Sequence, residues 1–136
     1  MANIDIQVPD IGDFDEVAVI ELLVKVGDKV KLGQELFSDK KTEGVIYTSP
    51  ACGTVSAINR GDQRVFHSVV IDIEGDDAVE FAKYSASDLP GLNAEQVQQN
   101  LVQSGLWTAL RTRPYSKAPA LGSKPSSIFV QAIDTN

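Results

Sequence analysis

The sequence predicts a mainly β fold, in which short strands form a two-sheet sandwich that is followed by a short helical segment and a terminal strand. Three observations support this prediction. Short apolar or alternating stretches recur through residues 3–75, separated by turns rich in glycine, proline and aspartate. Two turn motifs each occur twice, in the same order. After Gly75 the strand-like stretches give way to a helical pattern.

Six stretches have the composition of strands. They are residues 3–8, 16–24, 34–38, 45–49, 53–59 and 65–73. The first alternates Ile4, Ile6 and Val8 with polar residues, which is typical of a half-buried strand. Gly27 lies in a tight turn, where we expect it to adopt a positive φ. The polar residues 39–44 are predicted to form a hairpin tip between the third and fourth strands.

The strands fall into two similar half-units. Residues 9–12 (PDIG) resemble residues 50–53 (PACG), and residues 26–28 (VGD) resemble residues 60–62 (RGD). Neither half could bury its apolar face alone, so the repetition predicts a sandwich with pseudo-two-fold symmetry. The alternative is coincidence among residue types that are common in turns.

The second half of the chain is predicted to contain one main helix. Asn93 is a suitable N-cap, and Gln96 three residues later completes a capping box. Gly105 is expected to end the helical stripe. Residues 128–133 (IFVQAI) have the composition of a buried strand, and such a strand needs a sheet to join.

The predicted organisation follows from these elements. It is a β domain over residues 1–75, a helical extension over 76–110, a linker over 111–127 and the first strand of a truncated following domain over 128–136.

The charge is distributed unevenly. The formal net charge of −7 argues against nucleic acid as a general partner, because phosphate binding needs clustered bases. Residues 1–75 hold thirteen acids and seven bases, whereas no acid lies between Glu95 and Asp134. That stretch carries four bases, namely Arg111, Arg113, Lys117 and Lys124. Either it is a solvated loop, or it contacts an anionic lipid, a partner protein or a nucleotide.

No catalytic constellation is visible in the sequence. Cys52 is the only cysteine and His67 the only histidine. An internal disulfide therefore cannot form, and the chain offers few of the cysteine and histidine ligands that zinc sites use. The two residues fall in a predicted turn and a predicted strand. No glycine-rich phosphate loop is present, and a free-standing enzyme therefore has little support. No apolar run could span a bilayer and no secretion signal opens the chain, which makes a cytoplasmic location the expectation.

Residues 4–33 resemble the lipoyl domains of 2-oxoacid dehydrogenase acyltransferases. The matching words are VPDIGDF at 8–14 and VIELLVKVGD at 19–28. In that family a lysine at a hairpin tip carries a lipoyl group that swings between active sites. The resemblance implies a barrel-sandwich hybrid fold of the biotinyl/lipoyl type.

From about Gly33 onward the chain resembles the family of A subunits of the sodium-translocating NADH:quinone oxidoreductases. Its most distinctive words are LFSDKK at 36–41, INRG at 58–61 and SGLWTALRTRP at 104–114. The resemblance implies a barrel-sandwich in the N-terminal part of a peripheral protein at the inner face of the bacterial inner membrane. That region would be a scaffold without a cofactor, partnered by other subunits, while NADH, quinone and flavins belong to the implied complex.

The two resemblances differ in what they imply for Lys40. Asp39-Lys40 matches the lipoyl pattern, but Lys41 replaces the usual small residue and the tip is longer. We therefore expect an unmodified tip, and a lipoate-carrying Lys40 in a dehydrogenase complex is the alternative. Trp107, Arg111 and Arg113 are the candidates for an intersubunit contact, since such residue types are enriched at binding hot spots. Alternatively, Trp107 only packs the helix onto the barrel.

Overall fold

The computed structural model describes residues 3–7 and 20–132. Its strands are β1 (Asn3–Gln7), β2 (Ile20–Leu22), β3 (Lys29–Val30), β4 (Glu35–Asp39), β5 (Ile46–Thr48), β6 (Gly53–Arg60) and β7 (Phe66–Ile73). Its helices are the 3₁₀ turns η1 (Asp62–Arg64), η2 (Leu89–Gly91) and η3 (Leu106–Ala109), and the α-helix α1 (Ala94–Gln103).

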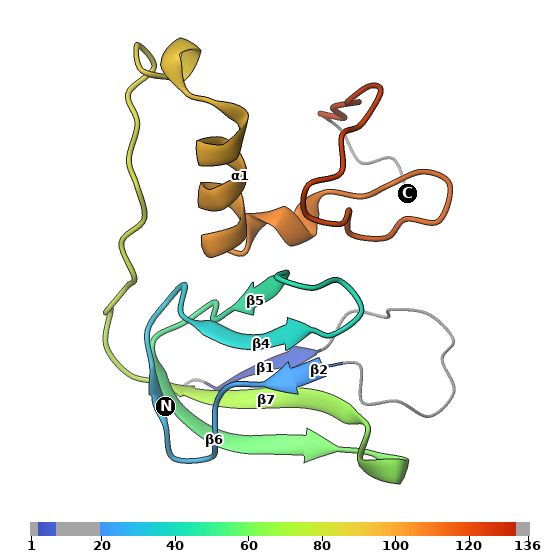
Figure 1. Cartoon of the computed structure of the whole chain (residues 1–136). Helices are drawn as coiled ribbons and strands as arrows, with labels where there is room; N and C mark the ends of the chain where they lie inside the picture. Colours follow the sequence, from blue (N-terminus) through green and yellow to red (C-terminus); the bar gives the residue numbers. More distant parts are fainter. Residues whose placement is uncertain (1–2, 8–19, 133–136) are drawn as a thin grey trace.

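The strands form two antiparallel sheets that pack face to face (Figure 1). One sheet has the order β1-β7-β6-β3 and the other β2-β4-β5. The β6–β7 hairpin is the longest pairing and runs from Gly53 opposite Ile73 to Arg60 opposite Phe66. The predicted mainly β architecture is confirmed. β2 occupies part of the strand predicted at 16–24, and the predicted turn at residues 9–12 lies outside the described residues.

The core lies between the two sheets. Its buried members are Val24, Val30, Leu36, Phe37, Val55, Val69 and Ile71. The Phe37 ring stacks on Tyr47 with ring centres 4.7 Å apart and meets Phe66 edge-on at 5.2 Å. Burying each large apolar side chain contributes about 1.5–3 kcal/mol, so this cluster is the main source of stability for the barrel.

Gly27 adopts the predicted positive φ, at 94°. Its amide donates to the Val55 carbonyl over 2.8 Å, and the Val55 amide donates to Asp28 over 2.9 Å. The turn at 26–28 therefore abuts the strand that follows the 50–53 turn. This pairing brings part of the first half-unit against the second.

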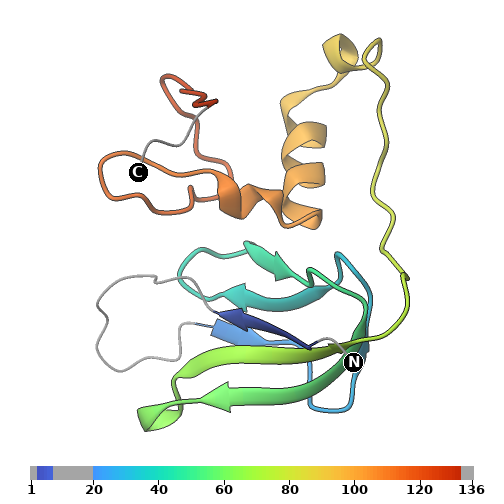
Figure 2. The ribbon, with the colours of Figure 1, turned by 180° about the vertical axis from the view of Figure 1, so that it is seen from behind.

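The chain leaves the barrel along one edge and then turns back over it (Figures 1 and 2). Leu32 exchanges backbone hydrogen bonds with this departing segment, through Leu32 N to Asp77 O and Val79 N to Leu32 O. The segment leads up to η2 and α1. The Asn100 side-chain amide then donates to Ala82 O over 3.3 Å, which ties the helix to the segment that led to it.

The capping box predicted for α1 is confirmed. Asn93 Oδ1 accepts from the Gln96 amide over 2.8 Å, and Gln96 Oε1 accepts from the Asn93 amide over 3.1 Å. Gly105, with φ of 77°, ends the helix as expected and leads into η3. None of the helices in the described part of the chain is long and apolar enough to cross a bilayer.

The strand predicted at 128–133 does not form over residues 128–132. Ile128, Phe129 and Val130 are 75–90% exposed. The pattern was strand-like, but a strand forms only when a sheet edge accepts its hydrogen bonds, and neither described sheet pairs with this segment. Residues 133–136 lie outside the described part.

Candidate functional site

The hairpin between β4 and β5 carries the candidate lysine. Three hydrogen bonds hold its tip: Lys41 N to Asp39 Oδ1 at 2.8 Å, and Val45 N to Thr42 O and Asp39 N to Val45 O, both at 3.1 Å. Val45 is fully buried beneath the tip. The tip is therefore an ordered turn rather than a loose loop.

Lys40 is exposed on this tip. An attachment lysine requires exposure, because the modifying enzyme and later the partner active sites must reach it. Exposure alone does not distinguish a carrier lysine from a solvated one. The surroundings of the tip are therefore more informative than the lysine itself.

The segment at residues 104–121 packs along the β4–β5 hairpin at two places (Figures 1 and 2). Thr48 Oγ1 donates to Ser104 O over 3.3 Å, and a Cβ built on Gly105 would lie only 2.5 Å from the same Thr48 oxygen. Near the tip, a Cβ built on Gly44 would lie 2.6 Å from Leu121 Cδ1. We call residues 104–121 the cover segment.

An arginine of the cover segment acts electrostatically on a tyrosine of β5. Burial raises the pKa of Tyr47, the charge of Asp39 raises it further, and the Arg111 guanidinium lowers it. Arg111 lies close enough to influence the phenol, and its Nη1 donates to the carbonyls of Thr108 and Leu110. These two hydrogen bonds hold the Arg111 guanidinium at the C-terminal end of η3.

The three predicted interface residues occupy different environments. Trp107 is 8% exposed, and its indole Nε1 donates to Pro119 O over 2.8 Å, so its ring packs inside the cover segment. Arg113 is exposed. An intersubunit role for Trp107, Arg111 or Arg113 stays a prediction.

Sequence reasoning missed Gly44, Tyr47, Thr48 and Leu121. A glycine in a hairpin tip often marks a place where another part of the chain approaches closely, so Gly44 could have been recognised from the sequence. In the structure its φ is 84°, in the left-handed region. Leu121 follows Ala118, Pro119 and Ala120 in the predicted linker. Its partner could not be identified from the sequence, because the two positions lie far apart along the chain.

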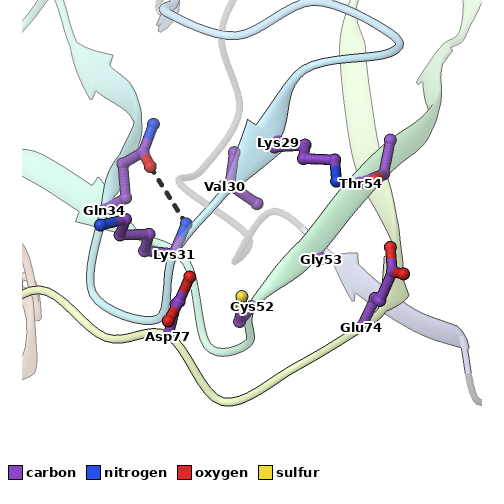
Figure 3. A pocket seen from close by; sticks show the side chains of 9 residues that line it. All are labelled: Lys29, Val30, Lys31, Gln34, Cys52, Gly53, Thr54, Glu74 and Asp77. Carbon is purple, nitrogen blue, oxygen red and sulfur yellow. Dashed lines mark hydrogen bonds between the residues drawn. The ribbon is translucent and has the colours of Figure 1, made fainter.

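A shallow groove elsewhere on the barrel is the second candidate (Figure 3). Its volume is about 330 Å³, and it is lined by Lys29, Val30, Lys31, Gln34, Cys52, Gly53, Thr54, Glu74 and Asp77. Lysines come from the β3 side and carboxylates from the segment after β7. The Lys31 amide donates to Gln34 Oε1 over 3.0 Å, a local turn contact.

The groove does not assemble a nucleophilic pair. Cys52 precedes Gly53 at one end of the β6–β7 hairpin, whereas His67 packs against Gly61 at the other end. A cysteine acts as a nucleophile when a base lies beside it, so this separation rules out a Cys52–His67 couple. Among the described residues, no group of three or more histidine, cysteine or acidic side chains could hold a metal.

Comparison with known proteins identifies the family. Residues 10–74 match the model of the NqrA N-terminal barrel-sandwich hybrid domain, and residues 92–136 match the NqrA second alpha/beta domain. Together these matches cover well over half of the chain. They establish the barrel-sandwich hybrid fold that the resemblance implied.

Curated relatives agree with the domain models. The A subunit of the Na(+)-translocating NADH-quinone reductase of Cellvibrio japonicus is 80% identical over 115 residues, which is 85% of this chain and 26% of that protein. Those of Hahella chejuensis and Haemophilus influenzae are 68% and 63% identical over 113 residues, which is 83% of this chain and 25% of each protein. The chain thus spans about a quarter of the length of these relatives. It belongs to the NqrA family, the A subunits of the Na(+)-translocating NADH-quinone reductases.

Proposed function

We propose that this chain is a scaffold and interaction module, the N-terminal part of the peripheral NqrA subunit of a sodium-pumping NADH:quinone oxidoreductase, and that it performs no chemistry of its own. The observation that carries the proposal is the packing of the cover segment on the lysine hairpin. A carrier domain works by presenting its tip freely to several partners. Here the same hairpin is already in contact with the protein's own chain.

The contacts are placed where they restrict the tip. Leu121 packs on Gly44, within the turn that holds Lys40, and Ser104 and Gly105 pack on Thr48 at the end of β5. A modifying enzyme that encloses the turn would have to displace Leu121. The longer tip, with Lys41 beside Lys40, departs further from the pattern that such an enzyme recognises.

The partners in this proposal are the other subunits of the reductase. The names of the relatives describe one subunit of a translocating enzyme, which supports a role in assembly. We place the chain peripherally at the inner, cytoplasmic face of the bacterial inner membrane. NADH, quinone and flavins would act elsewhere in the complex.

Although residues 128–132 form no strand in this structure, residues 128–136 are proposed to become the first strand of the following domain, when a sheet of that domain accepts their hydrogen bonds. The match of residues 92–136 to the second alpha/beta domain supports this assignment, as do the exposed apolar side chains of Ile128, Phe129 and Val130. The same match begins before α1. It therefore favours grouping α1 and η3 with the second domain rather than with the barrel.

Lipoylation tests the choice between scaffold and carrier. The chain is expressed with a lipoyl ligase and lipoate, beside a true lipoyl domain as positive control, and its intact mass is measured. We expect no added lipoyl group. A mass increase that is lost in Lys40→Ala but kept in Lys41→Ala would establish the carrier function and overturn the scaffold proposal.

A further inference from the structure

A closed turn projects from the cover segment at residues 112–117. The Thr112 amide and hydroxyl both donate to Lys117 O, over 2.8 and 3.1 Å, and the Ser116 amide donates to Thr112 O over 2.8 Å. The turn presents Arg113 and Tyr115 to solvent, and Tyr115 is 80% exposed. Tyr115 is thus an exposed aromatic side chain on a turn that is closed by its own hydrogen bonds.

The charge around this turn is opposite to that of the barrel. No acid lies between Glu95 and Asp134, whereas the chain as a whole carries −7. Arg111, just before the turn, is also exposed, but its guanidinium already donates to the carbonyls of Thr108 and Leu110. Arg113 and Tyr115 are the exposed arginine and tyrosine of the closed turn itself.

We propose that Arg113 and Tyr115 are a docking tip for an acidic patch on another subunit of the same complex, an inference that rests on the proposed function. A guanidinium pairs with carboxylates through two parallel hydrogen bonds, which gives both attraction and orientation. A tyrosine ring contributes contact area with little loss of side-chain freedom. Because the turn is closed by its own hydrogen bonds, docking loses less backbone entropy than a flexible loop would.

A protein surface fits this tip better than a lipid surface. A basic side chain near an anionic membrane contributes about 1 kcal/mol, so the few bases of this region would hold the chain only weakly. The acidic barrel would also be repelled by the same membrane. A protein partner can instead place carboxylates against Arg113 and a pocket against Tyr115.

Co-sedimentation with membranes tests the inference. The purified chain is mixed with membranes that contain the remaining subunits but lack NqrA, and with membranes that lack the whole reductase. We expect Arg113→Glu and Tyr115→Ala each to weaken binding to the first membranes by about tenfold or more. Lys124→Glu is the matched control, because Lys124 is an exposed base outside the turn, and it should change binding by less than about twofold.

The outcomes separate the two proposals. If the unaltered chain binds the first membranes and both variants bind equally well, the docking tip is wrong while the proposed function stands. If the unaltered chain binds both membranes alike, the proposed function fails and the inference with it. If protein-free vesicles of anionic phospholipid bind the chain as tightly, the partner is lipid and the inference is overturned. Thermal unfolding of each variant checks that these surface changes leave the fold intact.

Discussion

At the scale of single residues, the stability of the barrel depends on a few side chains enclosed between the sheets. Leu36 is fully buried, whereas Leu23, which is joined to it by a backbone hydrogen bond, is 48% exposed. The two leucines therefore offer a matched pair of truncations. They differ in burial but not in chemistry.

Leu36→Ala is expected to lower the free energy of unfolding by about 3 kcal/mol, from lost burial and the cavity left behind. Leu23→Ala should cost less than about 1 kcal/mol, since much of that side chain already contacts water. Urea unfolding of both variants measures the difference. Equal losses would show that Leu36 does not lie in the core.

The partial burial of Tyr47 makes the stability of the fold depend on pH. Its folded-state pKa lies above the ordinary value of 10.0, mainly because burial disfavours the phenolate. The neutral phenol therefore stabilises the fold at lower pH, and this contribution is lost as the pH rises through the folded-state pKa.

The Tyr47→Phe variant has no phenol to ionise, so it should not show this loss of stability at high pH. We expect the wild-type protein to lose more stability than Tyr47→Phe between pH about 8 and about 11, in urea unfolding followed at each pH. Tyr115→Phe, which removes an exposed hydroxyl, is the control and should behave like wild type. Parallel curves for wild type and Tyr47→Phe would contradict the prediction.

At the scale of elements, features that depend on residues close together in the sequence could be predicted, whereas contacts between residues far apart in the sequence could not. The capping box of Asn93 and Gln96 and the turn at Gly27 were predictable, because each depends on residues close together in sequence. The Leu121–Gly44 packing and the electrostatic effect of Arg111 on Tyr47 join distant positions, and no local pattern encodes them. The strand predicted at 128–133 failed over residues 128–132 for the same reason, since a strand depends on a partner that the pattern does not contain.

Leu121 is expected to restrain the hairpin tip. In Leu121→Asp, a carboxylate would have to lose water in order to pack on Gly44, so the cover segment should lift from the tip. Amide exchange at Asp39 and Val45, whose hydrogen bonds close the tip, should then become about tenfold faster.

Leu89→Asp provides the control for this change. Leu89 is 58% exposed, whereas Leu121 is partly buried, and Leu89 lies in η2, which stands away from the hairpin (Figure 1). Its substitution should leave the exchange of Asp39 and Val45 unchanged. If Leu121→Asp also leaves their exchange unchanged, then Leu121 does not restrain the tip.

At the scale of the whole molecule, the barrel and the helical part differ in how many buried residues stabilise them. Among the described residues, the core cluster of the barrel has seven buried members, whereas no residue of α1 is fully buried. The cover segment reaches the barrel through the Thr48–Ser104 hydrogen bond and the packing of Leu121 on Gly44. Regions with few buried contacts open at lower free energy than a core, so the two parts should not unfold as one.

The single tryptophan allows that separation to be measured. Trp107 reports on the cover segment, and the methyl groups of Val69 and Ile71 report on the barrel core. In a urea titration, we expect the Trp107 fluorescence transition at a lower midpoint than the loss of the native methyl NMR signals. Leu36→Ala should move the methyl transition toward that of Trp107, because it weakens only the core. Coincident midpoints in the wild-type protein would instead mean that barrel and cover segment form one cooperative unit, and the cover would then be an integral part of the barrel fold.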